Sequence, residues 1–545
     1  MVNLAGYTRL TSKIMKKRTI IYTFLLAVTI GHSSCEKKDE DKFRDSQVAE
    51  VELRSPINES IVVLGEEQTD LQFKWTEATV SNGTLAFYTV LFDKVSGDFT
   101  EPLMTRRPEK LGSAYTLTLP RLQLDSLAKA VGATVGNPVD VKWTVRASNG
   151  INSSVAKDPF TFRLEVTQDM NTDMLMTAAD QMMDALITYF LDGMPLDIWG
   201  EYYPRRNTFW DGASTVWGQG AVFSGYTALK FMGEHDPGLK LKYANLYDNR
   251  LLTSIDKFRN RRQGGPEGYA VFPGDGDERF YDDNVWIGLD MVDLYTLTGD
   301  SKYLDRAKLV WDFVLSGSND LMGGGIHWKE GDKGKNTCST APAAVLGAKL
   351  YKATNEQVYL DRAKEFYHWV QDRLQDPEDK LYWDNIKLSD PNNPSSSVII
   401  DKTKFTYNAG QPIQAAVLLY EITGDNKYLE DARETADAAY KRWFKPYYSP
   451  VLGEEITMWN DNNVWFNAIL LRGYIELCRI DKDEKYVQAY RKIMQHAWMS
   501  PAKDANTNLL NNDFKATAPR PESGILYQGA CLEMLARLAE FDANK

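Results

Sequence analysis

The C-terminal two-thirds of the chain repeats one pattern at intervals of about 60 residues. The phrase Tyr-Leu-Asp-Arg-Ala-Lys occurs at 303–308 and again at 359–364, and related cues stand at Tyr243, Tyr428 and Tyr486. Each cue is predicted to open an amphipathic helix, and a helix richer in small and apolar residues precedes it. Repeats of this length indicate helical hairpins that stack into a solenoid or close into a toroid.

Counting these helices decides between the two architectures. The first five apolar helices are each followed by an amphipathic helix, and Thr172–Leu191 supplies a sixth outer member. An open array needs polar capping repeats at its ends, and the sequence shows none. We therefore predict an all-α (α/α)6 toroid over residues 169–545. Its six inner helices are expected at Val216–Met232, Asp283–Leu297, Ser339–Tyr351, Asn408–Ile422, Asn463–Leu477 and Ser523–Phe541.

Residues 48–168 follow a different, strand-like pattern. Short segments rich in alternating apolar residues are separated by turn signals such as Asn82-Gly83 and Asn149-Gly150. A helix-like insert is expected at Leu122–Val131. The chain is therefore predicted to be multidomain, with a small all-β immunoglobulin-like or fibronectin-like sandwich before the toroid. The strands are expected at 71–75, 87–92, 115–119 and 139–145.

The first 47 residues read as targeting sequence. A basic stretch beginning at Met15 precedes an apolar stretch at 19–31, which is too short to span a bilayer but suits a signal peptide. His-Ser-Ser-Cys at 32–35 resembles a bacterial lipobox, with an unusual histidine. We predict a signal peptide over 1–35 with its true start at Met15, lipidation at Cys35, and a charged tether over 36–47. A plain secretory signal is the alternative.

Composition excludes several functional classes. The net charge of −12 over 545 residues argues against a nucleic-acid binder, which needs a basic face. Five histidines without paired spacing predict no metal site, and no nucleotide-binding or serine-hydrolase fingerprint stands in its required context. We expect no cofactor. Cys338, Cys478 and Cys531 are too widely spaced for a disulfide framework and are read as free, mostly buried thiols.

The segment Tyr-Asp-Asp-Asn-Val-Trp at 281–286 carries the chemistry. Glycosidases use two carboxyl groups that flank the scissile bond, roughly 5–5.5 Å apart in retaining enzymes. Two adjacent aspartates inside a helix diverge, but at a helix N-terminus Asp282 can occupy the cap while Asp283 begins the helix. The helix dipole then favours one ionised carboxylate, whose charge raises the proton affinity of the other. From spacing alone, an aspartate cap with a surface neighbour is the simpler interpretation.

The same segment resembles the paired-aspartate motif of glycoside hydrolase family 76, whose members are endo-α-1,6-mannanases. Further motifs resemble the family in the same order, and together they cover about residues 172–541. The resemblance implies a retaining mechanism with Asp282 as nucleophile and Asp283 as general acid/base. The further motifs are Asn-Thr-Phe-Trp-Asp at 207–211, Trp-Gly-Gln-Gly at 217–220, Gly-Gly-Gly-Ile-His-Trp at 323–328, residues 335–344 and Phe-Thr-Tyr-Asn-Ala-Gly at 405–410.

Aromatic and amide side chains near these motifs are candidates for sugar binding. Flat rings can stack on sugars, although core packing is the commoner role of any single ring. The amides are candidate partners for hydroxyl groups. His327 replaces an aromatic residue that is common beside Trp328, so that subsite is expected to differ. The candidates are Trp217, Gln219, Tyr281, Trp286, Trp328, Asn336, Tyr407 and Asn408.

The N-terminal region resembles SusE-type outer-membrane proteins of glycan utilisation. This resemblance implies an outer-membrane lipoprotein exposed at the cell surface, with the periplasmic face or secretion as alternatives. Its expected partners are α-mannan, the outer membrane and other glycan-utilisation surface proteins. Two other functions stay open: a non-catalytic surface glycan-binding lipoprotein, and another (α/α)6 sugar enzyme such as an unsaturated glucuronyl hydrolase.

Overall fold

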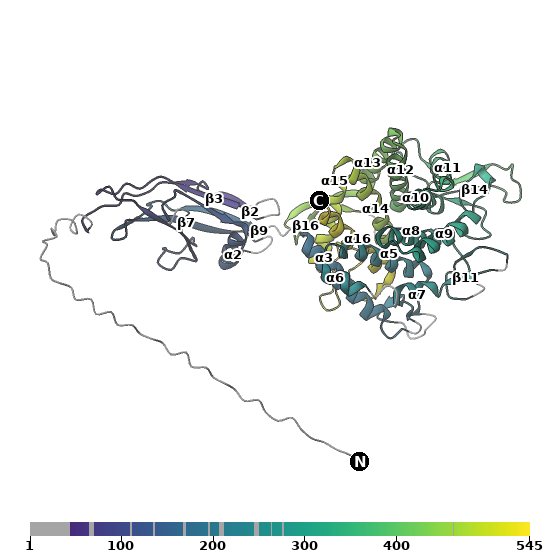
Figure 1. Ribbon diagram of the computed structural model, residues 1–545, viewed down its shortest axis with the longest axis horizontal. Helices are drawn as coiled ribbons and strands as arrows, with labels where there is room; N and C mark the ends of the chain where they lie inside the picture. The colour runs from purple at the N-terminus through teal and green to yellow at the C-terminus, as the bar shows by residue number, and fades with distance from the viewer. Residues whose placement is uncertain are drawn as a thin grey trace, which may run out of the picture.

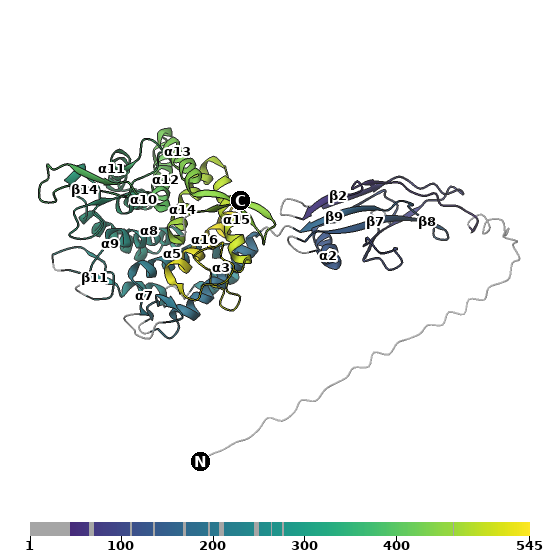
Figure 2. The ribbon, with the colours of Figure 1, turned by 180° about the vertical axis from the view of Figure 1, so that it is seen from behind.

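The structure of the protein is a computed structural model. It describes residues 44–64, 70–108, 112–133, 137–166, 170–194, 197–205, 212–244, 250–262, 264–274, 277–460 and 463–545. The predicted signal peptide, Cys35, most of the tether and the motif at 207–211 lie outside these residues. A strand-rich region and a helical region lie end to end along the longest axis (Figures 1 and 2).

The strand-rich region contains two sheets. One has the order β1-β3-β6; the other has the order β2-β9-β7-β4-β5, with β8 paired to β7. Both sheets contribute to one hydrophobic cluster, in which the ring of Phe73 packs edge-on against Phe92 and Trp143 at centroid distances of 5.0 Å. The predicted strands and the helical insert are confirmed within a few residues. The elements are β1 Leu53–Ser55, β2 Ser60–Leu64, β3 Asp70–Trp75, β4 Phe87–Lys94, β5 Met104–Arg106, β6 Thr116–Pro120, α2 Arg121–Val131, β7 Val139–Ser148, β8 Ser153–Val155 and β9 Phe160–Val166.

The helical region is a closed ring. Among the described residues, each of six apolar helices packs against the next, and the last, α16, packs against the first, α5. These helices are buried on nearly all sides, which explains why they are apolar all round rather than along one stripe. The predicted toroid and its inner helices are confirmed. The inner helices are α5 Val216–Gly233, α8 Tyr281–Thr298, α10 Thr337–Thr354, α12 Thr406–Thr423, α14 Val464–Asp481 and α16 Ile525–Ala543.

The outer helices are amphipathic and surround this ring. Two of them begin at an aspartate whose side chain caps the first turn: Asp300 accepts from the backbone N–H of Lys302, and Asp425 from that of Lys427. The outer helices are α3 Thr172–Leu186, which continues as the π-helical turn Ile187–Leu191, then α9 Ser301–Ser316, α11 Gln357–Leu374, α13 Asn426–Trp443 and α15 Lys485–Met499.

One outer helix differs from the prediction. Tyr243 was expected to open a helix, but it ends α6 (Pro237–Tyr243), and α7 spans only Leu252–Asp256. The helix begins earlier because Asp236 caps it, accepting from the backbone N–H groups of Gly238 and Leu239, and Pro237 occupies its first position. The first outer member is therefore divided into short pieces in the described residues.

Glycine allows the ring to close. A Cβ atom on Gly529 of α16 would lie 2.8 Å from the backbone carbon of Ala221 in α5, nearer than side chains approach backbone. Helices α5 and α16 can therefore pack backbone to backbone at this point.

The axis of the ring contains buried charge. Arg472 on α14 donates two hydrogen bonds, of 2.6 and 2.9 Å, to the carboxylate of Glu533 on α16, and both side chains are buried. Asp290 on α8 accepts a 2.6 Å hydrogen bond from Ser224. Burial raises the pKa of Asp290 to about 7, even though the positive charge of Arg472 opposes the shift.

Short strands precede the inner helices and gather at one end of the ring. They include β12 (Glu267–Tyr269) before α8, β13 (Lys335–Asn336) before α10 and β15 (Val398–Asp401) before α12. The others are β10 Tyr202–Tyr203, β11 Arg259–Arg261, β14 Asn385–Leu388, β16 Phe444–Ser449, β17 Glu454–Trp459 and β18 Ser523–Gly524. Among all these described elements, no helix combines the length and the apolar character that crossing a membrane requires.

Candidate active site

A cavity of about 490 Å³ opens at this end of the ring. Its walls are largely aromatic, and both aspartates of the 281–286 segment line it. The side chains come from the N-terminal ends of α5, α8, α10, α12 and α14 and from the loops before them. They are Thr215, Trp217, Val271, Phe280, Asp282, Asp283, Trp286, Trp328, Asn336, Cys338, Asp384, Asn385, Phe405, Tyr407, Trp465 and Phe466.

Helix α8 positions the two carboxyl groups. It begins at Tyr281 with Phe280 as the cap residue, so Asp282 and Asp283 both lie in its first turn. The expectation that Asp282 occupies the cap is therefore wrong. Asn284 fixes this end of the helix, because its amide hydrogen-bonds the backbone N–H and carbonyl of Tyr269 and the carbonyl of Phe280. Both aspartates thus enter the cavity from one rigid turn.

Asp282 accepts hydrogen bonds from two side chains. The indole N–H of Trp328 donates to its Oδ2 at 3.1 Å, and the thiol of Cys338 lies 3.5 Å from the same oxygen. Its other oxygen, Oδ1, is buried and accepts no hydrogen bond among the described residues. Burial raises the pKa of Asp282 to about 6, while the hydrogen bonds from Trp328, the backbone and Cys338 limit the rise.

Asp283 is in a less favourable setting for a charge. Burial raises its pKa well above the usual value, and the negative charge of Asp282 raises it further. The two groups interact strongly and titrate as a pair. Asp282 ionises first because it has the hydrogen-bond donors, which leaves Asp283 as the member that retains the proton.

The loop that carries Trp328 is fixed against α8. The backbone N–H of Tyr281 donates to the carbonyl of Trp328 at 2.8 Å, and Phe280 forms a β-bridge with Lys329. Gly325, with φ of +76°, packs so closely on the ring of Trp369 that a Cβ would lie 2.7 Å from it. This loop geometry delivers the indole N–H to Asp282.

Five of the eight predicted sugar-binding residues line the cavity: Trp217, Trp286, Trp328, Asn336 and Tyr407. Trp328 is 41% exposed, so part of its ring surface is accessible to a ligand. Trp286 is nearly buried, with only 4% of its surface exposed, so it contributes only a small part of the cavity wall.

The other three predicted residues are not brought into the cavity. Gln219 is buried and hydrogen-bonds both the N–H and the carbonyl of Trp199, so it ties two backbone segments together. Tyr281 is buried and stacks on Phe313 with ring centroids 4.9 Å apart. Asn408 donates a 3.1 Å hydrogen bond to Asp384 and therefore supports a residue that does line the cavity.

His327 also lies away from the cavity lining. Its Nδ1 lies 2.7 Å from the carbonyl oxygen of Gly334, and its Nε2 lies 3.0 Å from the amide of Asn319. Burial and the nearby Lys335 lower the pKa of the imidazole. The histidine therefore supports the loop beside Trp328 rather than forming a subsite.

Sequence reasoning missed Asp384, Trp465 and Phe466. Asp384 is a third carboxyl group at the cavity, held by Asn385 and Asn408, and burial raises its pKa. Trp465 packs edge-on against both Trp217 and Trp286 at centroid distances of 5.3 and 5.2 Å. A signal for Trp465 was present, because Asn-Val-Trp at 463–465 repeats Asn-Val-Trp at 284–286 at the start of another inner helix.

The closed ring of helix pairs and the paired carboxyl groups in an aromatic cavity define a glycoside hydrolase of the toroidal class. The chain belongs to glycosyl hydrolase family 76, whose model matches residues 174–544. The model of the SusE outer membrane protein matches residues 38–146, which suggests an outer-membrane location.

Two solved structures are similar over nearly their whole length. A family 76 glycoside hydrolase (mannosidase) from Bacteroides thetaiotaomicron is 40% identical, with a TM-score of 0.64, and the match covers 67% of this chain and 98% of that one. A family 76 glycoside hydrolase from a bovine Bacteroides thetaiotaomicron strain is 32% identical, with a TM-score of 0.67, and the match covers 90% of this chain and 98% of that one.

Curated relatives are more distant. A mannan endo-1,6-alpha-mannosidase of Candida albicans is 29% identical over 214 residues, which are 36% of this chain and 46% of the relative. The chain spans about half the length of the curated relatives it matches.

Proposed function

We propose that the chain is a retaining, endo-acting α-1,6-mannanase that hydrolyses the α-1,6-mannan backbone of yeast or fungal type at the cell surface. The observation that carries this proposal is the pair Asp282 and Asp283 in one aromatic cavity, with the pKa of Asp283 raised by burial and further by the charge of its neighbour. The names of the family 76 mannosidase and of the mannan endo-1,6-alpha-mannosidase relative support the substrate class.

In this proposal Asp282 attacks the anomeric carbon and Asp283 protonates the leaving oxygen. Asp282 suits the nucleophile because it ionises first, and its buried Oδ1 has no competing donor among the described residues. Asp283 suits the acid because burial and the charge of Asp282 raise its pKa, so it is the member of the pair that retains the proton. A glycosyl-enzyme forms on Asp282, and water then releases the sugar with Asp283 acting as base.

The cavity walls suit a neutral sugar chain. Trp217, Trp328, Tyr407 and Trp465 offer ring faces and edges to sugar carbons, and Asn336 and Asp384 offer polar atoms to hydroxyl groups. None of the described lining residues is basic, which disfavours an unsaturated glucuronyl hydrolase because its substrate carries a carboxylate. A non-catalytic glycan-binding role does not account for two adjacent buried carboxyl groups whose pKa values are both raised.

Incubation with debranched yeast mannan, followed by thin-layer chromatography, tests the proposal. Released oligosaccharides of several lengths are expected for an endo-acting enzyme, and Asp282→Ala should release none. Binding without any product would support the glycan-binding alternative. Proton NMR of the first product tests retention, since a retaining enzyme releases the α-anomer first.

We also propose the domain division and the anchor. The division is a signal peptide over 1–35, a tether over 36–47, an immunoglobulin-like or fibronectin-like sandwich over 48–168 and the toroid over 169–545, with Cys35 lipidated and the toroid exposed at the cell surface. The two-sheet arrangement around one core supports the sandwich. Several acyl chains on one cysteine would anchor the protein firmly. Cys35→Ala should move the protein from the membrane fraction to the soluble fraction, and a soluble wild-type protein would contradict the anchor.

A further inference from the structure

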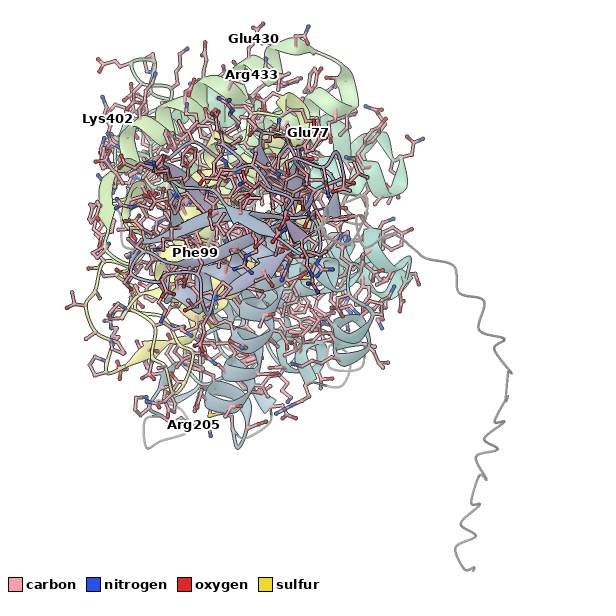
Figure 3. The ribbon with its side chains drawn as sticks, turned by 90° about the vertical axis from the view of Figure 1, so that its left-hand side faces the viewer. Glu77, Phe99, Arg205, Lys402, Glu430 and Arg433 are labelled. Carbon is pink, nitrogen blue, oxygen red and sulfur yellow. The ribbon has the colours of Figure 1, made fainter. Side chains whose placement is uncertain are left out.

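A second cavity lies on the strand-rich region, far along the sequence from the active site. Its volume is about 390 Å³, within the usual range for ligand pockets. It is bounded by β4, β5 and β7 and by the loop that joins β4 to β5. Figure 3 faces this region and labels Phe99 of that loop.

Strand register places polar side chains together on this face. Thr89 of β4 pairs with Arg146 of β7, and Leu91 of β4 pairs with Thr105 of β5, so these residues share one face of the sheet. Val90 points to the opposite face and belongs to the buried core. Arg107, the residue after β5, lines the same cavity as Thr89 and Arg146.

These two arginines are exposed and form no ion pair among the described residues. A third, Arg106, also lines the cavity, but its guanidinium is engaged by Gln123 at 2.7 Å. The whole chain carries a net charge of −12, so a concentration of unpaired arginines runs against the overall composition. Guanidinium groups bind phosphate and carboxylate oxygens through paired hydrogen bonds.

The loop holds an aromatic ring at the cavity in a costly conformation. Phe99 has φ of +63°, a left-handed geometry that bulky residues seldom adopt. The buried carboxylate of Asp93 accepts from the backbone N–H of Phe99 at 2.9 Å, and Lys142 lies 5.0 Å from the centre of the ring and donates to the carbonyl of Gly97. Strain that a structure maintains in this way is typical of functional sites.

We propose that this cavity binds a glycan whose sugar residue carries an oxyanion, and that this oxyanion is a phosphate group. The ring of Phe99 contacts the apolar face of the sugar, and Thr89 and Thr105 hydrogen-bond its hydroxyl groups. The hydroxyl of Thr100, which donates to Asp98, can accept from one of them. Arg107 and Arg146 bind the anionic group. The strand-rich region then retains glycans that carry negative charge, a recognition that the active-site cavity does not provide, because three aspartates and no basic residue are among its described lining residues.

A sugar fits this site better than a phosphate-bearing lipid surface does. A membrane headgroup needs a projecting basic face, whereas here the arginines lie beside a pocket with an aromatic wall and three threonine hydroxyls.

Affinity electrophoresis of the full chain tests the proposal, with Asp282→Ala included so that the polysaccharide is not degraded. Phosphorylated mannan in the gel should retard the protein, and the same mannan after chemical dephosphorylation should not. Arg107→Gln with Arg146→Gln should weaken the retardation at least tenfold. Arg163→Gln is the matched control, because it removes one charge from the same sheet at a residue paired with Asp140 outside the cavity.

Phe99→Gly provides an independent readout. Glycine accepts the left-handed backbone without strain, so this variant should resist urea better than the wild type while binding the glycan more weakly. The double variant Arg107→Gln with Arg146→Gln, made in the active enzyme, should leave hydrolysis of a short unphosphorylated α-1,6-mannooligosaccharide unchanged. This readout separates the binding proposal from the catalytic one.

A polyuronate that retards the protein as strongly as phosphorylated mannan does would support the anion site but would show that it also accepts a carboxylate. Equal retardation by both forms of mannan would overturn the proposal. So would binding of the wild type to phosphate-bearing lipid vesicles without any binding to glycan.

Discussion

The thiol sulfur of Cys338 lies 3.5 Å from Oδ2 of Asp282, the oxygen that also accepts the indole N–H of Trp328. Burial and the charge of Asp282 raise the pKa of this thiol, so it remains protonated and acts as a donor. Of the three cysteines expected to be free and buried, all are so, but Cys338 alone among them lines the described active-site cavity. A residue that the sequence predicted only as a free, buried thiol therefore stabilises the ionised form of the proposed nucleophile.

Replacing Cys338 by alanine should raise the pKa of Asp282. Because Asp282 must be ionised to attack, we expect activity of the wild type to fall as pH drops through about 6. Loss of one hydrogen bond to a carboxylate should move this acidic limb of kcat/KM upward by about 0.5–1 pH unit. Cys338→Ser retains a donor and should keep the limb close to that of the wild type. An unchanged limb in the alanine variant would show that the thiol does not act on Asp282.

Substitutions of Asp282 and Asp283 should reduce activity in different ways. Asp282→Ala should remove nearly all activity, since no other group can form the glycosyl-enzyme. Asp283→Ala should spare aryl mannosides with good leaving groups, which need little protonation, while losing about 10²–10⁴-fold on mannan. The basic limb of the wild-type kcat/KM profile should reflect loss of the proton from Asp283, whose pKa is raised by burial and by Asp282. Near-wild-type turnover of mannan by both variants would contradict the assignment.

Closure of the ring should depend on Gly529. An alanine there brings a Cβ to 2.8 Å from the backbone of α5, and the resulting overpacking should cost about 1–3 kcal/mol in free energy of unfolding. Gly220→Ala is the matched control, because its Cβ would find its nearest neighbour at 4.0 Å and the better helix propensity should leave stability unchanged or slightly higher. Urea titration of both variants measures the difference, and equal losses would show that close packing at Gly529 is not what limits substitution.

Asp290 should make the toroid less stable as pH rises. Its pKa is about 7 in the folded chain because of burial, against an ordinary value of 3.8, so the folded state holds a proton that the unfolded state releases. Stability from this group is complete below about pH 4 and declines until about pH 7. Asp290→Asn should therefore gain stability relative to the wild type between pH 5 and 8, by at most on the order of 4 kcal/mol. Asp361→Asn, on the exposed face of α11, should show no such pH-dependent gain.

The inner helices could be located from sequence because their residues are apolar on every side and their turns are rich in glycine and aspartate. Helix α12, for example, was expected at 408–422 and spans Thr406–Thr423. The first outer helix was misplaced because the tyrosine cue was given more weight than Asp236-Pro237, a stronger start signal. Local capping chemistry decided that boundary, and it was legible in the sequence.

The site could be predicted only in part, because residue type does not reveal which way a side chain points. The aspartate pair was found, but Gln219 and Tyr281 face the interior, where Trp199 and Phe313 pack against them. Asp384 does not lie at the start of a helix. It lines the cavity because β14, the strand after it, pairs with β13, and this pairing is not visible in the sequence. Its hydrogen bond from Asn408 could not have been inferred from spacing.

The two proposed catalytic carboxyl groups come from consecutive residues in one helical turn. Only one peptide unit separates their backbones. Small movements of the helices or of a loop can therefore shift the sugar, but they do not separate the backbones that carry the two carboxyl groups. Apart from the loop before α10, which delivers Trp328 to Asp282, the connections before the other inner helices can therefore change length and composition without disturbing the two carboxyl groups. A scaffold of this kind divides into a constant chemical core and an adjustable rim, and new glycan preferences can arise at the rim alone.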